Sequence, residues 1–540
     1  MRRDPERAER RLRASVLAGV AALALAGCAD EPAGTGGDFT FALPGDPGGL
    51  DPHHSATYAP VMMLGFAYEG MVARGPDLEP RPGLAESWTQ TSDSITYRLR
   101  DGLTCADGTP LTIRDVAENF AYIADPANGS SLLGAGVPVG AKVEVDAPGR
   151  AVTIRAAKPN SFLLDMTGGV PMVCRRGLQD RERLRNHTEG TGPFRLTEAR
   201  ANDVYVFERR QGRTWGIEPT SAAAPRRVVV RIVPNASTAA NLLLAGEITA
   251  AGVTGFDRLR LERAGFKAVR SRSPAVQMWF NQAEARATHE EAVRRAMILG
   301  VDVGQLAKVA GGGHWVLPPR RLAGAEPMAC ATDTATPATP RRDARAAAAL
   351  LDRAGWRLGA DGIRTKQGRR LRLQLVYDRE LTDASMIAAA VELAVLQWRE
   401  IGIEVEARSL AGPMIGEVLF GTSDYDISWV PVIVSLPNRL MMFTSGPKPP
   451  KGLNFPNLDM PEAVALAATA NTKAGPASCP DWDALEGLYL KSSAALPILD
   501  SDNPIYTRDA TFRRGGLPIV ADSVRLTPAD AKTPTGRAGP

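Results

Sequence analysis

The sequence predicts an α/β protein of two lobes, and three observations lead to this prediction. The chain has 540 residues, and the roughly 510 that remain without an N-terminal signal exceed what one hydrophobic core usually holds. Segments with strand periodicity alternate with segments of helical periodicity in both halves of the chain, which is typical of α/β folds. Apart from Cys28, the chain has four cysteines, two in each half. We therefore expect two lobes, each with its own core.

The N-terminus has the pattern of a bacterial lipoprotein signal. An arginine-rich start, Met1–Arg13, precedes the apolar stretch Val16–Ala26, which is shorter than the about 20 residues that span a bilayer. Small residues lead directly to Cys28. We expect residues 1–27 to be removed and Cys28 to be lipidated, so that the protein is anchored to the cell membrane on its extracytoplasmic face. An uncleaved anchor and an ordinary signal peptide are the alternatives.

The charge of the chain argues against a nucleic-acid partner. The whole sequence has 64 basic and 60 acidic side chains. Residues 1–27 hold six of the arginines and three of the acids, which leaves 58 basic and 57 acidic side chains in the remainder. Nucleic-acid binding requires a cluster of basic groups that contact phosphates, and the remaining arginines are scattered.

The first lobe is expected to begin after a short linker. Residues 28–38 are small, polar and glycine-rich, which predicts a flexible spacer, and the first strand is expected at Phe39–Leu43. Thr112–Ile123 is predicted to be a helix because its apolar residues recur at helical spacing and Thr112 with Asp115 resembles a capping box. The further strands predicted here are Ile95–Leu99, Lys142–Val145, Val152–Arg155, Val204–Glu208 and Val228–Val233.

The second half continues the alternation. Thr288 with Glu291 indicates a capping box before a helix that reaches Met297. Two more helices are predicted at Asp343–Ala354 and Asp383–Ile401, ended by Gly355 and Gly402. The strands predicted here are Leu371–Tyr377 and Ile403–Val405. Residues 524–540, rich in Pro, Ala, Thr and Gly, are expected to form a disordered tail.

The cysteine count suggests disulfides. An even number in an exported protein favours bridges, and four cysteines allow three pairings. We favour Cys105–Cys174 and Cys330–Cys479, one in each lobe. No pair has the CxxC spacing of a zinc site.

No catalytic pattern is present, so we expect neither an enzyme nor a cofactor. None of the five histidines stands in an HExxH motif, and the sequence has no GxSxG or GxxxxGK[ST] motif. His53 and His54 are adjacent, and neighbours in a strand point to opposite faces. We therefore predict no metal site.

Ordered runs along the chain resemble the extracytoplasmic solute-binding proteins of ABC importers, the family that binds oligopeptides, dipeptides or nickel. The most specific block is Arg81–Tyr122, with Leu-Ala-Glu-Ser-Trp, Arg-Asp-Gly and Asp-Gly-Thr-Pro-Leu-Thr before a helix. The likeness extends from Phe39 to Ser523. Further runs in the family's order are Leu50–His53, Tyr68–Val72, Gly190–Phe194, Asn241–Ile248, Phe280–Asn281, Ala292–Met297, Ala346–Trp356, Trp398–Val405 and Ser423–Ile427.

The resemblance implies a periplasmic-binding-protein-like fold with mixed sheets and a hinge between the lobes. Lobe I would comprise 39–271 with a return at 500–523, and lobe II 272–499. A monomer would capture a peptide or peptide-like solute in the interlobe cleft and deliver it to ABC permease subunits. A sensor or chaperone-like receptor of the same fold is one alternative. A non-peptide solute such as a sugar, a metal complex or a secondary metabolite is another.

The region that sets ligand specificity departs from the family pattern. Peptide-binding relatives have a Trp followed by an aspartate that pairs with the peptide's α-ammonium. Trp429 matches, but the acid position falls near Val432 or Ile433, and a buried ammonium without a carboxylate is costly. The sequence thus favours a capped peptide or one held through its backbone. The candidate ligand-binding residues are His54, Tyr58, Trp279, Asn281, Trp429, Val432, Asn438 and Arg439, the last as the partner of a carboxylate or else as a surface arginine.

Overall fold

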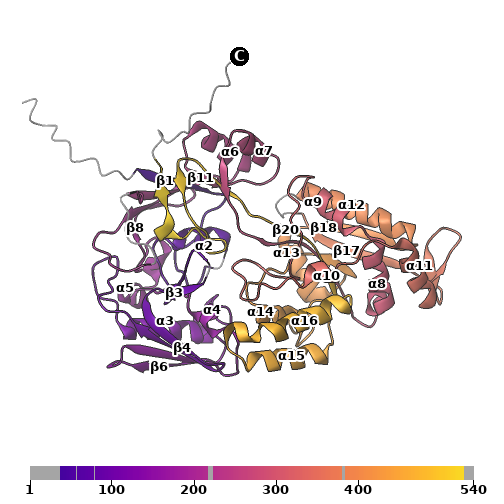
Figure 1. The fold of residues 1–540 in the computed structure, drawn as a ribbon, viewed down its shortest axis with the longest axis horizontal. Coiled ribbons are helices and arrows are strands. Elements are labelled where there is room, and N and C mark those ends of the chain that lie inside the picture. Colours follow the sequence, from indigo (N-terminus) through magenta and orange to yellow (C-terminus); the bar gives the residue numbers. More distant parts are fainter. Residues whose placement is uncertain (1–36, 56, 78, 217–222, 380–383, 528–540) are drawn as a thin grey trace, which may run out of the picture.

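A computed structural model describes residues 37–527, except residues 56, 78, 217–222 and 380–383. The predicted signal peptide, Cys28, the linker up to residue 36 and the tail from residue 528 lie outside the described residues. The described chain forms two α/β lobes with mixed sheets (Figure 1). This confirms the predicted fold class.

The first lobe contains a seven-stranded mixed sheet in the order β12-β21-β11-β1-β10-β9-β8. β1 lies between two parallel neighbours, β10 and β11, and the other pairings are antiparallel. β21 belongs to the C-terminal part of the chain, drawn yellow in Figure 1, which returns to this lobe. The strands are β1 (Asp38–Leu43), β8 (Phe194–Arg200), β9 (Val204–Arg209), β10 (Arg227–Ile232), β11 (Ala250–Gly252), β12 (Lys267–Val269) and β21 (Ile505–Thr507).

A second sheet of the first lobe is antiparallel and has the order β4-β5-β7-β6. Its strands are β4 (Ala85–Gln90), β5 (Ser94–Leu99), β6 (Lys142–Asp146) and β7 (Ala151–Arg155). Its apolar side chains share one hydrophobic cluster with the apolar side of α3 (Ile113–Ala124). The remaining α-helices here are α2 (Tyr58–Leu64), α4 (Leu163–Thr167), α5 (Arg175–Gln179), α6 (Ala236–Ala245) and α7 (Asp257–Arg263).

The second lobe is organised around a five-stranded mixed sheet in the order β18-β17-β19-β13-β20. Its strands are β13 (Ser273–Phe280), β17 (Arg372–Asp378), β18 (Glu404–Leu410), β19 (Ile427–Trp429) and β20 (Ala495–Ser501). One face packs with α8 (Glu291–Gly300), α9 (Val303–Ala310), α11 (Ala344–Arg353) and α12 (Ala384–Glu400). The opposite face packs with α13 (Gly412–Gly416), α14 (Pro437–Thr444), α15 (Pro461–Asn471) and α16 (Cys479–Lys491).

Short elements complete the fold. The short helix α10 (Ala335–Ala338) contacts α16. Three small antiparallel sheets are also present among the described residues. The first pairs β2 (Val72–Arg74) with β3 (Pro80–Pro82), and the second has β15 (Arg364–Lys366) between β14 (Arg357–Leu358) and β16 (Arg369–Arg370). The third pairs β22 (Ala510–Thr511) with β23 (Arg525–Leu526).

The chain passes twice between the lobes, from β12 to β13 and from β20 to β21. Ion pairs lie beside these crossings: Arg258 and Arg270 both contact Asp502, at 2.9 and 2.8 Å, and Arg272 contacts Asp500 at 3.1 Å. The predicted lobe boundaries at 271/272 and 499/500 stay predictions.

One predicted helix cap is present and one is wrong. The Thr112 Oγ1 accepts a hydrogen bond from the Asp115 N–H at 3.2 Å, and the Asp115 carboxylate accepts one from the Thr112 N–H at 2.9 Å, which is the reciprocal capping box. Thr288 instead lies in the 3-10 helix Ala287–His289, and its hydroxyl donates to the Asn281 carbonyl. Helix α8 therefore starts later than expected.

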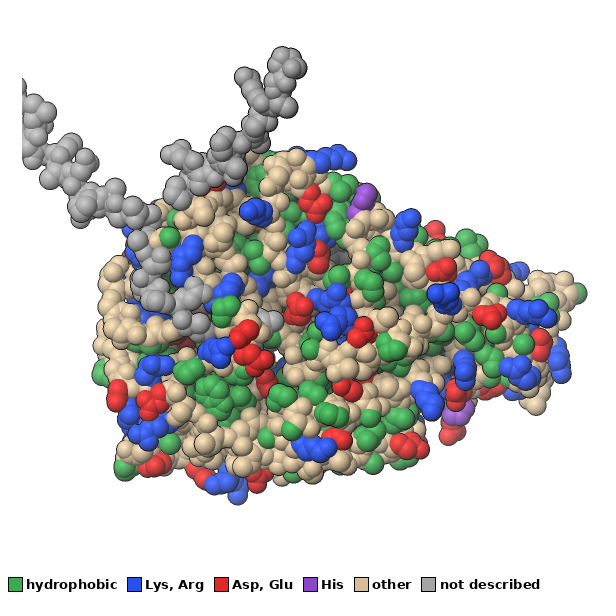
Figure 2. Space-filling view, in the orientation of Figure 1, with side chains coloured by type: hydrophobic (Ala, Val, Ile, Leu, Met, Phe, Trp, Pro, Cys, Tyr) green, Lys and Arg blue, Asp and Glu red, His purple; other side chains and the backbone are tan. Residues whose placement is uncertain are grey.

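The structure contains two disulfides, Cys105–Cys174 and Cys330–Cys479. These are the two pairs that the sequence analysis favoured, one in each lobe. Basic and acidic side chains are interspersed over the face drawn in Figure 2. Within the described residues, none of the helices has both the length and the apolar character needed to cross a bilayer.

Candidate functional site

A cavity of about 610 Å³ lies where the lobes face each other, a volume typical of small-molecule sites. Most of its wall comes from the first lobe, and the second lobe contributes Arg439, in the first turn of α14. The wall is mainly apolar, with Val61, Leu64 and Met166 among the side chains that line it. The first-lobe segments of the wall are α2 and the stretches 68–74, 131–136, 165–171 and 515–522.

The lobes also touch at the rim opposite the crossings. The Ser161 hydroxyl donates to the Ala470 carbonyl at 2.8 Å, and the Gly475 N–H donates to the Ser161 carbonyl at 2.6 Å. The Phe162 ring lies 6.3 Å from the Trp482 ring. These contacts join the residues just before α4 of the first lobe to α15, the 3-10 helix Gly475–Ser478 and α16 of the second. α4 and α16 lie near each other in the lower half of Figure 1. The lobes are therefore closed on each other in this structure.

Two acids in the cavity wall share one arginine. Arg213 lies 2.9 Å from Asp522 and also contacts Glu69, while the Trp215 indole N–H donates to Glu69 at 3.0 Å. Burial raises the pKa of Glu69 despite the opposing charge of Arg213. One guanidinium thus bonds both carboxylates inside the protein.

The third acid of the wall is also paired. Asp165, on α4, lies 2.5 Å from Arg74 on β2. Each carboxylate that the described residues bring to this cavity therefore already has an arginine partner.

Arg439 is different because no carboxylate among the described residues lies within ion-pair distance of it. Its guanidinium donates to the Ala135 carbonyl of the first lobe. Its Nε is buried and has no hydrogen-bond partner among the described residues. Burial alone lowers the pKa of Arg439. The second lobe thus places a partly desolvated cation, without a counter-ion, in the wall of the cavity.

The first-lobe residues predicted to bind ligand line other hollows. The His54 Nε2 lies 2.8 Å from the Tyr122 hydroxyl, in a hollow of about 580 Å³ that Arg181 also lines. Tyr58 starts α2 and lines a hollow of about 400 Å³ beside Gly252 of β11. Their roles in binding stay predictions.

The aromatic and apolar residues predicted in the second lobe lie in its core. Trp279 is fully buried and packs against Phe455, with ring centroids 5.7 Å apart. Trp429 is buried on the other face of the sheet. Val432 is 7% exposed, and both its N–H and its carbonyl bond the Gln277 side chain, at 2.7 and 3.1 Å. In the closed form none of the three is among the described residues that line the 610 Å³ cavity.

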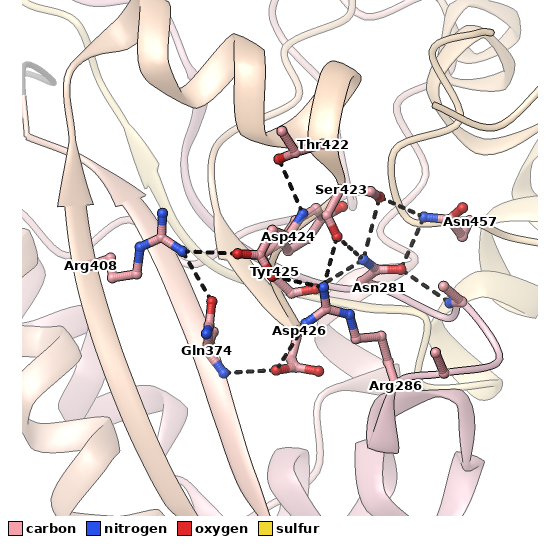
Figure 3. Close-up of polar contacts among 12 residues, drawn as sticks. Asn281, Arg286, Gln374, Arg408, Thr422, Ser423, Asp424, Tyr425, Asp426 and Asn457 are labelled. Carbon is pink, nitrogen blue, oxygen red and sulfur yellow. Dashed lines mark hydrogen bonds and ion pairs between the residues drawn. The ribbon is translucent and has the colours of Figure 1, made fainter. Parts of the chain in front are cut away.

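Asn281 belongs to a polar network within the second lobe (Figure 3). Its amide donates to the Tyr425 carbonyl at 2.9 Å and to the Ser423 carbonyl at 3.1 Å. Its carbonyl accepts from the Ala283 N–H at 3.0 Å and from the Asn457 amide at 2.9 Å. With both ends bonded within the protein, Asn281 anchors the segment that follows β13.

Asn438 and Arg439 are the predicted residues that the structure brings to the boundary between the lobes. The Asn438 amide donates to the Asn160 side chain of the first lobe at 3.0 Å, and the next residue in the chain, Arg439, donates to Ala135. No sequence pattern marked Arg74, Asp165 or Asp522 as part of the site. Glu69 stood in a run that resembled the family, but no local pattern marked it as part of a cavity.

Two lobes with mixed sheets, two crossings and a cavity between them define a binding protein of the periplasmic-binding-protein type. The family model "Bacterial extracellular solute-binding proteins, family 5 Middle" matches residues 79–443. The chain therefore belongs to this family, which confirms the resemblance.

Curated relatives and solved structures agree with this assignment. The nickel-binding periplasmic protein of Escherichia coli (strain K12) is 28% identical over 387 residues, which cover 68% of this chain and 70% of the relative. Protein XP55 of Streptomyces lividans is 27% identical over 367 residues, or 64% of this chain and 62% of that protein, which is under two thirds of its length. The oligopeptide-binding protein AppA of Bacillus subtilis, solved with a nonapeptide, has a TM-score of 0.67 at 18% identity and covers 91% of this chain and 99% of its own. That likeness shows the fold.

Proposed function

We propose that this protein captures a peptide or peptide-like solute in the interlobe cavity and delivers it to the permease of an ABC importer. The observation that carries the proposal is the cavity of about 610 Å³ between the closed lobes, with apolar walls and one unpaired cation. The family assignment supports solute binding, and the solved relative with a nonapeptide supports a peptide.

Closure of the lobes is the step that would signal a bound solute. A ligand shifts an open–closed equilibrium only as far as its contacts are better in the closed state. A solute between the first-lobe wall and Arg439 would make its full set of contacts when the lobes meet. The permease would then recognise the closed form.

We also propose that Cys28 is lipidated and that the mature protein is a monomer held at the outer face of the cell membrane. Metabolic labelling with radioactive palmitate should mark the wild type and not Cys28→Ser. Labelling of both proteins would contradict lipidation at Cys28. Light scattering of the detergent-solubilised protein should give the mass of one chain.

Thermal unfolding tests the binding function. The full-length chain, purified in detergent, would be heated with pooled tri- to pentapeptides, either free or N-acetylated. A ligand at 100 times its dissociation constant adds about 2.7 kcal/mol to the free energy of unfolding, enough for a clear rise in melting temperature. A rise with either pool would support peptide capture. No rise with both pools would overturn it in favour of a non-peptide solute, and the name of the nickel-binding relative makes a metal complex the next class to assay.

A further inference from the structure

We propose that Arg439 is the specificity-determining residue of the interlobe cavity and selects apolar solutes that carry a carboxylate and no free ammonium group. This inference rests on the proposed function and assigns the chemical class of its solute. An acyl-capped peptide with a free C-terminus fits this description.

Arg439 has more hydrogen-bond donors than partners among the described residues. A guanidinium has five N–H donors, and the hydrogen bond of Arg439 to the Ala135 carbonyl satisfies one of them. The buried Nε has no partner among the described residues. A carboxylate is the group that fits the remaining donors best, because arginine and carboxylate pair through two parallel hydrogen bonds.

A second buried arginine of the same lobe shows how the fold satisfies a structural guanidinium. Arg294, on α8, is 5% exposed, and burial lowers its pKa to about 10. Its N–H groups donate to four backbone carbonyls, at 2.8–3.2 Å. The acceptors are Thr288, His289, Ser492 and Ser493. Arg439 lacks such a cage, and it is one of the residues that line the cavity.

The acids of the wall explain why an ammonium group would be disfavoured. Glu69 and Asp522 share Arg213, and Asp165 pairs with Arg74. An ammonium in this cavity would have to share a carboxylate with an arginine that already bonds it, or remain unpaired, and an unpaired buried charge is costly. A carboxylate would meet Arg439 without displacing an existing ion pair.

The position of Arg439 also couples recognition to closure. It is carried by the second lobe, whereas the rest of the described wall comes from the first. A solute carboxylate can therefore bond Arg439 while its apolar body touches the first lobe only when the lobes are together. Recognition of the solute carboxylate is therefore coupled to closure of the lobes.

Calorimetry with three dipeptide probes tests the inference. The probes are N-acetyl-Leu-Phe, its C-terminal amide and unmodified Leu-Phe, titrated into the full-length chain in detergent. Hydrogen bonds to charged groups correspond to about 10- to 100-fold in affinity, so the acetylated acid should bind at least about 10-fold more tightly than the amide. Leu-Phe should bind more weakly than the acetylated acid because its ammonium has no free partner.

Three variants separate a selective role from a structural one. R439Q should bring the acid-to-amide ratio to about one, and R439K, which retains the charge, should keep a preference for the acid. The matched control R294Q should lower the melting temperature and leave the ratio unchanged, because Arg294 does not line the cavity. A uniform loss of affinity for acid and amide in R439Q would overturn the inference and make Arg439 a latch to Ala135.

Two further outcomes distinguish the inference from the proposed function. Equal binding of the acid and the amide by the wild type would overturn the role of Arg439 and leave peptide capture intact. If no dipeptide binds, hydrocinnamate and its amide replace them as probes. If hydrocinnamate then binds more tightly than its amide, and R439Q loses this preference, the role of Arg439 is supported while peptide capture fails. If neither hydrocinnamate nor its amide binds, both the role of Arg439 and peptide capture are overturned.

Discussion

Phe162 is a first-lobe side chain buried in the core of the second lobe, and its truncation tests the coupling between closure and binding. The residue precedes α4, is fully buried and packs with Trp482 and the apolar cluster of α13–α16. Its neighbour Leu163 belongs instead to the first-lobe cluster. The Phe162 ring therefore leaves its apolar surroundings when the lobes separate.

Phe162→Ala should shift the equilibrium toward the open form. Truncating a buried Phe to Ala costs about 3–5 kcal/mol, and about 3 kcal/mol corresponds to roughly 100-fold in the ratio of closed to open protein. Apparent solute affinity falls with the closed fraction. Calorimetry with N-acetyl-Leu-Phe should therefore show a loss of up to about 100-fold, and small-angle scattering without solute should show a larger radius of gyration.

Phe120→Ala is the matched control. Phe120 is also fully buried, but it stacks on Tyr97 within the first-lobe cluster, with ring centroids 6.4 Å apart. This variant should lower the melting temperature without changing the radius of gyration or the affinity. The reasoning about closure is refuted if Phe162→Ala leaves both quantities at their wild-type values while it lowers the melting temperature.

Three other substitutions give separate tests. Burial raises the pKa of Asp500 to about 7, so the folded state binds its proton more tightly than the unfolded chain. The free energy of unfolding of the wild type should therefore fall by up to about 4 kcal/mol between pH 4 and 7. In urea unfolding at a series of pH values, Asp500→Asn should not show this fall. Equal pH dependence of the wild type and the variant would contradict the role of Asp500. Replacing Cys330 and Cys479 by alanine removes a bridge between residues 149 apart in the sequence and should lower the free energy of unfolding by about 2–5 kcal/mol. Tryptophan fluorescence during urea unfolding measures this change. An unchanged midpoint would contradict a stabilising role of the disulfide. Val432→Asp would bury a carboxylate among apolar side chains and should lower stability by about 3 kcal/mol; tighter binding of Leu-Phe in calorimetry would show that this position faces the solute.

The elements with clear periodicity could be predicted from the sequence to within a few residues. β5 and β7 each have one buried and one more exposed face, so the alternation of apolar residues was visible. Helix α11 begins after Asp343, whose carboxylate accepts from the Ala346 N–H at 2.8 Å, as a helix N-cap does. Gly402 follows α12 with φ of 83°, a conformation that favours glycine.

Two strands of the second lobe, β13 and β20, escaped prediction because both faces of their sheet are covered. In β13 and β20 nearly every residue is buried, so no alternation marks them as strands. Gly190 and Gly192 could be recognised in the family-like run Gly190–Phe194, but the sequence did not indicate why these positions are glycine. A Cβ at either position would collide with the backbone of Ala67, so these glycines allow two chain segments to approach closely.

The cavity itself could not be predicted, because its wall is formed by side-chain contacts between segments that are far apart in the sequence. Arg213 meets Asp522 across 309 residues, and Arg439 meets Ala135 across 304. The sequence could nominate Arg439 from its place after Trp429, and it could note that an acid was missing nearby. In the folded structure each acid of the wall is bonded by an arginine, whereas Arg439 has no acid within reach among the described residues. This difference can be seen only when both lobes are in place. The missing aspartate and the unpaired arginine then favour the same solute: one whose amino end carries no charge and whose other end is a carboxylate.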